Sequence, residues 1–229
     1  MTQTLLDQRV LGVGTALDDH TITASDVISF ADVGASNAIK KDTVQGVLDL
    51  AGGGAWNFIT SVTTSGGASF EFKHGTNNVV LDSTYALYEI VITNIFTSVD
   101  NRTMLMYAST DTGSSYTALT YAYHEIIVDS SSGSYNGTTT NTDRIECGRA
   151  FGNQTGEAGF LRMTLADPSN TSKYKIVDFT GGQYNSNTHY QANMGGAVIK
   201  TNSAVDAVKF NPESGNITCF AALYGLSKT

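Results

Sequence analysis

The chain has 229 residues, a formal net charge of −8 and 15% charged residues, and its 41% apolar content is ample for a core. No cluster of lysine or arginine extends beyond Lys40-Lys41, so we expect no nucleic-acid partner. The apolar runs are too short to span a bilayer and residues 1–7 show no export signal. We therefore expect no membrane partner and assembly in a cytoplasm.

Residues 1–25 precede the first clear secondary-structure pattern. They form either an arm that orders against a neighbouring molecule or a floppy terminus, and the sequence leaves both readings open. Val27 to Phe30 is then a short run with high β propensity, which predicts a strand. The small and polar residues Gly34 to Asn37 predict a turn after it.

A short helix is predicted next, over about residues 42–51. Asp42 or Thr43 can cap its first turn, and Gly52 to Gly54 end it. A helix of about two turns is marginal alone in water, because nucleation costs more than so few turns return. Its apolar face therefore needs a partner, which we expect to be another copy of the chain or a larger assembly. That face carries Val44, Val47 and Leu48.

The same stretch carries a recognisable set of positions: Asp26, Ile28, Phe30, Asp32, Ser36-Asn37, Lys40-Lys41, Thr43-Val44 and Leu48. In this arrangement it resembles a short repeat found near the start of many tail-fibre and other virion proteins of bacteriophages. The resemblance implies a homotrimer that also attaches to other virion proteins through residues 1–55. The contacts expected to make this attachment are Ile28, Phe30, Val44, Val47 and Leu48.

From Trp56 onward the apolar period changes to two, which is typical of half-buried strands. The predicted strands cover residues 56–62, 69–72, 79–81, 85–96, 104–108, 121–128, 144–149, 160–166, 174–179, 189–194, 197–199, 205–210 and 217–223. This spacing predicts an all-β fold, an antiparallel β-sandwich or jelly roll of about ten to twelve strands, over residues 56–229. Blocks within it, Asp82 to Ile92, Ala108 to Tyr116 and Leu223 to Leu226, are similar to β-sandwich domains that end many phage structural proteins.

Residues that could carry chemistry are scattered. The four histidines have no partner at metal-ligand spacing, and the glutamates cannot be paired from sequence, so we expect no catalytic, metal or cofactor site. Cys147 and Cys219 each follow an isoleucine at the second position, which favours two buried thiols over one disulfide bridge. Cys147 beside Arg149 as a nucleophile is the weaker alternative.

Two segments predicted as loops combine tyrosine, amide and glycine residues. Aromatic rings offer a stacking surface and amides offer adaptable hydrogen bonds, so these loops are candidates for contact with a bacterial surface glycan or protein. The competing reading is ordinary turn composition, with the tyrosines anchoring the loops. The candidate receptor contacts are Tyr135, Asn136, Tyr184, Asn185, His189 and Tyr190.

Three functions follow from these expectations. The first is a non-enzymatic virion component of the tail-fibre or adhesin type, which displays its β-sandwich for host attachment. The second is a capsid decoration, cement or head-fibre protein that stabilises the particle. The third is a small surface-glycan hydrolase.

Overall fold

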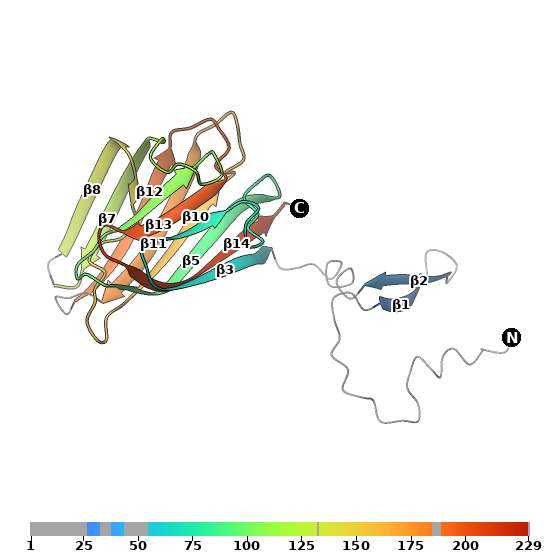
Figure 1. Ribbon diagram of the computed structural model, residues 1–229, viewed down its shortest axis with the longest axis horizontal. Coiled ribbons are helices and arrows are strands. Elements are labelled where there is room, and N and C mark those ends of the chain that lie inside the picture. Colours follow the sequence, from blue (N-terminus) through green and yellow to red (C-terminus); the bar gives the residue numbers. More distant parts are fainter. Residues whose placement is uncertain (1–26, 33–37, 44–54, 132, 185–188, 229) are drawn as a thin grey trace, which may run out of the picture. The chain divides into compact units, whose positions relative to one another are not determined.

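The computed structural model describes residues 27–32, 38–43, 55–131, 133–184 and 189–228 (Figure 1). The chain divides into two compact units, Met1–Gly54 and Ala55–Thr229. Each unit is described by itself below.

The described part of the first unit is a pair of antiparallel strands, β1 (Val27–Asp32) and β2 (Ala38–Thr43). The strand predicted at Val27 is confirmed. Asp42 and Thr43, the predicted capping residues, are the last two residues of β2, where they pair with Ile28 and Val27 in the β ladder. The rest of the predicted helix, including Val44, Val47 and Leu48, lies outside the described residues.

The second unit holds two antiparallel sheets, which confirms the all-β prediction. The larger sheet has eight strands in the order β3 (Trp56–Gly67), β14 (Ile217–Ser227), β5 (Tyr85–Thr97), β10 (Ala158–Ala166), β11 (Lys175–Tyr184), β12 (Tyr190–Ile199), β7 (Tyr121–Asp129) and β8 (Gly133–Thr142). The smaller sheet has four strands in the order β4 (Phe70–Lys73), β13 (Ala207–Pro212), β6 (Met104–Ser109) and β9 (Ile145–Glu146). Figure 1 shows β13 lying across the face of the larger sheet, in front of β10 and β11.

The core lies between the two sheets and follows from alternation along each strand. On β5, Tyr88, Ile90 and Ile92 are fully buried, as the sequence pattern predicts. The smaller sheet contributes buried side chains to the same cluster, among them Phe72, Met106 and Phe210. β6 lies between β13 and β9 and is buried along most of its length, which confirms that its run of apolar residues is internal.

Four segments differ from the prediction. The strand predicted over residues 144–149 is reduced to the two residues of β9, Ile145–Glu146. Residues 79–81 form a loop and not a strand, since Asn77 and Asn78 adopt left-handed backbone angles (φ 50° and 61°) and turn the chain there. The two strands predicted at 189–194 and 197–199 are one continuous strand, β12. Residues 133–142, predicted mainly as a polar loop, form the edge strand β8, which pairs with β7 through its backbone.

Both cysteines are free and buried, as favoured from the sequence. Cys147 and Cys219 lie on the same strand faces as the fully buried Ile145 and Ile217. Burial raises the pKa of the Cys147 thiol well above its ordinary value and that of Cys219 to about 12. These thiols therefore pack as small apolar side chains, and the nucleophile reading of Cys147 finds no support.

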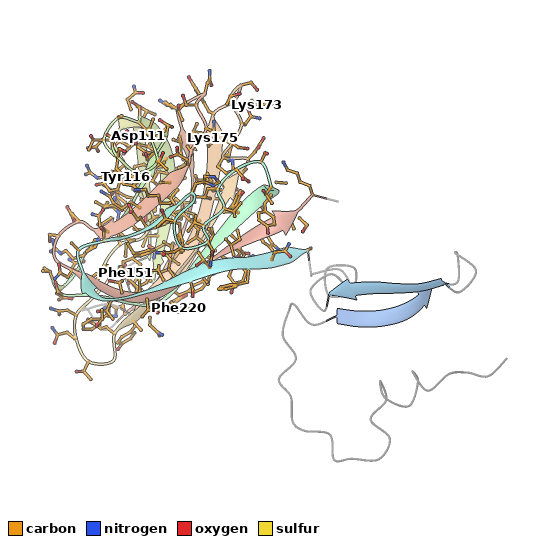
Figure 2. The ribbon with its side chains drawn as sticks, turned by 45° about the vertical axis from the view of Figure 1, so that its right-hand side comes forward. Asp111, Tyr116, Phe151, Lys173, Lys175 and Phe220 are labelled. Carbon is orange, nitrogen blue, oxygen red and sulfur yellow. The ribbon has the colours of Figure 1, made fainter. Side chains whose placement is uncertain are left out.

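A buried lysine closes one end of the sandwich. Lys175 is fully buried, and its Nζ donates hydrogen bonds to the carbonyl oxygens of Asn170 (2.5 Å), Lys173 (2.9 Å) and Thr201 (3.1 Å). Three acceptors match the three donors of an ammonium group, so the buried charge is fully hydrogen-bonded. Figure 2 shows Lys175 near one end of the sandwich and Phe151 toward the other.

Candidate functional site

A cavity of about 530 Å³ opens at the end of the larger sheet that is remote from Lys175. Its walls come from β7 (Ile127, Asp129), from β8 (Gly133 to Tyr135) and from Gln191 of β12. Two loops complete it, one with Asn101 and one with Arg149 and Ala150. Cavities of this size hold small ligands or parts of larger ones.

Strand register brings the polar side chains of the cavity together. Gln183, Gln191 and Asp129 are cross-strand neighbours on β11, β12 and β7. The Nε2 of Gln191 donates to Asp129 Oδ2 at 2.7 Å, and the Nε2 of Gln183 donates to Gln191 Oε1 at 3.0 Å. Asn193, one inward position further along β12, donates from Nδ2 to Gln183 Oε1 at 2.6 Å. The row is thus oriented by its own hydrogen bonds.

Arg149 is the central charge of the site. Its Nε donates to Glu125 Oε2 at 2.9 Å, and its Nη2 donates to Glu146 Oε2. The Glu125 side chain is fully buried, and this burial raises the pKa of its carboxyl while the bond from Arg149 opposes the shift. The carbonyl oxygen of Arg149 in turn accepts a hydrogen bond from Gln183 Nε2. The arginine therefore connects the loop after β9 to β7 and β11 of the larger sheet and to β9 of the smaller one.

Tyr135 forms an aromatic wall of the cavity. The Arg149 guanidinium carbon lies 5.4 Å from the centre of its ring, in a cation–π arrangement. The ring also lies beside Gly137, where an added Cβ would come within 3.3 Å of Tyr135 Cε1. The missing side chain at Gly137 leaves room for this ring position. Tyr135 nevertheless remains 54% exposed, so a ligand can reach it.

The candidate receptor contacts that the structure describes lie at this end of the larger sheet, but they divide between its two faces. Tyr135 is the cross-strand neighbour of the buried Ile127 and shares its inner face. Tyr184 and Tyr190 pair with each other across β11 and β12, next to the inward Gln183 and Gln191, and therefore lie on the outer face.

The remaining predicted residues fall as follows. Tyr135 and Asn136 belong to the edge strand β8 and not to a loop, and Asn136 is exposed on the face opposite Tyr135. His189 directly precedes β12 and is partly buried. Asn185 lies outside the described residues. Ile28 and Phe30 lie on β1 of the first unit.

Asp129, Arg149 and Gln191 were not among the residues predicted for the site. One signal in the sequence points to such a region: polar residues at positions where the alternation expects apolar ones. On β7 the inward positions run Tyr121, Tyr123, Glu125, so a carboxylate stands in a row of buried aromatics. A buried charge at such a position requires a partner, and Arg149 is that partner.

The described residues bring together no group of three histidine, cysteine or acidic side chains able to hold a metal ion. In this same part of the chain no helix is long and apolar enough to cross a membrane.

Comparisons with protein-family models, with curated proteins and with solved structures found no match to this chain. Its function is therefore argued from the fold and the cavity.

Proposed function

We propose that this chain is a non-enzymatic bacteriophage virion component of the tail-fibre or adhesin type. In this proposal its sandwich binds a bacterial surface glycan through the cavity beside Tyr135. The observation that carries the binding role is the cavity itself. It combines an exposed tyrosine ring with a carboxylate and an amide that are already oriented by hydrogen bonds. Sugars need this combination, because their rings have apolar C–H faces and hydroxyl edges.

The strand order supports a jelly roll as the particular type of sandwich. β3, β14, β5 and β10 lie side by side in one sheet, and β4, β13, β6 and β9 form the other. The chain moves between the two sheets as the two Greek keys of a jelly roll require, with the hairpins β7–β8 and β11–β12 added beyond β10. Jelly rolls recur in viral capsid and lectin domains, which agrees with the proposal by analogy only.

In this proposal the two units have separate roles. Residues 1–54 attach the chain to the particle and to its sister subunits as a homotrimer, and the sandwich faces the host. The support is the resemblance of residues 26–50 to the virion repeat. A self-contained core in Ala55–Thr229 adds to it, since such a domain can be displayed at a distance from the attachment point.

The test has two arms, and both use the full-length chain. The first measures binding of the labelled chain to a glycan array and to bacterial cells, where glycan binding that depends on Tyr135 supports the adhesin role. The second locates the chain on purified particles by immunogold labelling and measures its copy number. A few copies at the tail support the tail-fibre proposal, whereas an icosahedral copy number without glycan binding overturns it in favour of a capsid decoration protein.

The hydrolase alternative needs two carboxylates about 5 to 10 Å apart that can act on one bond. A halo of degraded surface polysaccharide around spotted protein, lost in an Asp129→Asn variant, would overturn the non-enzymatic proposal. We expect no halo from the unaltered chain.

A further inference from the structure

The charge balance of the cavity indicates the class of glycan that it takes. Among the described residues that line it, Arg149 is the one cationic side chain, and its guanidinium donates to the carboxylates of Glu125 and Glu146. A third carboxylate, Asp129, lines the cavity directly. One positive charge therefore faces three acidic groups, and an anionic sugar would meet net repulsion.

The chain as a whole adds to this repulsion. Its formal net charge is −8, so an acidic polysaccharide is disfavoured at long range as well as in the cavity. A site built for carboxylated or phosphorylated sugars would instead present an arginine or lysine with donors directed at the ligand. Two of the Arg149 nitrogens are already occupied by the glutamates.

The remaining lining groups suit an uncharged sugar ring. The exposed part of the Tyr135 ring offers a surface for the C–H face of a pyranose. Asp129 accepts from Gln191 through Oδ2 and from the backbone N and the Oγ of Ser131 through Oδ1, so its carboxylate is held by the chain itself. The Gln191 amide has two N–H donors and gives one to Asp129. The second donor of Gln191 can therefore reach a hydroxyl of a sugar in the cavity.

We infer that the cavity binds a neutral pyranose, stacked on Tyr135 and hydrogen-bonded by Gln191, and that it rejects acidic sugars. This inference rests on the proposed glycan-binding function and adds the ligand class. Stacking on Tyr135 would bring the sugar to the inner face of the sheet, on the side away from Tyr184 and Tyr190.

The experiment compares neutral and acidic glycans on one array. The probes are oligosaccharides of glucose, galactose and mannose, together with matched ones that carry glucuronate, sialate or phosphate. We expect hits among the neutral probes alone. The dissociation constant of the best neutral hit should change little between low and high salt, because no charge pair forms on binding.

Two matched variants locate the site. Tyr135 and Tyr190 are similarly exposed, at 54% and 56%, but lie on opposite faces. We expect Tyr135→Ala to weaken binding of the neutral hit about tenfold, the loss of one aromatic stacking contact, and Tyr190→Ala to leave it within about twofold. Gln191→Ala should also weaken it, and thermal melts of each variant should show that the sandwich remains folded.

The possible failures are distinguishable. An array without any hit overturns the proposed function, and the inference with it. Hits confined to acidic glycans leave the proposed function standing and overturn the neutral-sugar inference. Neutral binding that is lost in Tyr190→Ala and kept in Tyr135→Ala overturns the cavity as the site.

Discussion

At the scale of single residues, the sandwich places charged groups inside and gives each a particular partner. Lys175 is enclosed by three carbonyl oxygens, and one oxygen of the Glu125 carboxylate, Oε2, accepts from Arg149. A buried ion pair contributes little over an apolar pair, but loss of one partner is costly because the remaining charge stays desolvated. The stability of the molecule is therefore sensitive at these positions.

We expect Arg149→Met to lower the free energy of unfolding by about 3 to 5 kcal/mol at pH 8, because it leaves the Glu125 carboxylate buried without its cation. Arg144→Met is the matched control, since Arg144 pairs with the exposed Asp143 and, at 3.6 Å, with Glu146, which keeps its bond from Arg149. This substitution should cost under about 1 kcal/mol. Guanidinium unfolding curves of the three proteins measure both losses. An equal loss in the two variants would contradict the argument.

The same variant should show a defined pH dependence. Burial already raises the pKa of Glu125 in the folded chain, and removal of Arg149 raises it further. A carboxyl with a raised folded-state pKa binds its proton more tightly in the folded state, so the penalty is complete above that pKa and decreases as the pH falls toward the unfolded value. The gap in unfolding free energy between Arg149→Met and the unaltered chain should thus narrow from pH 8 to pH 5. A constant gap would show that Glu125 is not the cause.

The buried thiols give a second prediction at this scale. Cys147 and Cys219 are buried and carry raised pKa values, so both remain protonated and inaccessible at pH 8. We expect negligible reaction with a thiol reagent such as Ellman's reagent in the native chain, and release of two thiols per chain in guanidinium. Fast native labelling of either cysteine would contradict its burial.

At the scale of elements, β12 shows that two neighbouring glycines in one strand can differ in how much room they leave for a side chain. Gly195 and Gly196 interrupt the apolar pattern, yet the strand runs through both. A Cβ on Gly195 would lie 2.3 Å from His124 O and 2.4 Å from the Phe179 ring. A Cβ on Gly196 would lie 3.0 Å from Asp178 Oδ1, a tight contact with the end of a side chain, and 3.5 Å from Val177 O, an ordinary van der Waals contact. The first glycine is thus needed for packing, and the second is not.

These neighbouring glycines form a matched pair for mutation. We expect Gly195→Ala to destabilise the sandwich by roughly 1 to 3 kcal/mol, because Phe179 and the β7 backbone must move. Gly196→Ala should be nearly neutral, since Asp178 can shift and alanine restricts the unfolded chain. Thermal and chemical unfolding of both variants check this difference. Similar losses would mean that the two positions are equally restricted.

The strands that could be predicted from the sequence are those in which apolar and polar residues alternate, because this alternation marks the buried face. Tyr88, Ile90 and Ile92 define β5 in this way, because one face of a strand against a core must be apolar. The edge strand β8 carries no such signal, since its residues are mostly exposed and its position follows from backbone pairing with β7. The helix predicted over about residues 42–51 lies mostly outside the described residues and stays a prediction.

Less of the cavity than of the fold could be predicted from the sequence. Its tyrosine was among the expected receptor contacts, but Asp129, Arg149 and Gln191 come from distant parts of the chain. Asp129 and Gln191 meet because the register of β12 and β7 aligns them, and Arg149 reaches the same place from the loop after β9. A register depends on pairing that single stretches of sequence do not specify.

At the scale of the whole molecule, the sandwich has a complete core of its own. Among the residues whose burial the structure describes, the main buried cluster runs from Phe70 to Leu223. We expect removal of residues 1–54 to shift the thermal unfolding midpoint of the sandwich by less than about 2 °C. Under the proposed function, the full chain is a trimer and the truncated chain a monomer, which light scattering after size-exclusion chromatography measures. A truncated chain that fails to fold, or that remains trimeric, would contradict this division.

The larger sheet has twice as many strands as the smaller one, and its extra strands, β11, β12, β7 and β8, all lie beyond β10. Under the proposed function, folding energy and recognition are therefore supplied by partly separate strands. Residues at the rim of the added strands could then change identity during adaptation to a new host while the compact centre stays constant. A library of variants restricted to Asn101, Asp129, Ser134, Tyr135 and Gln191 should thus yield altered ligand preferences among proteins that still fold.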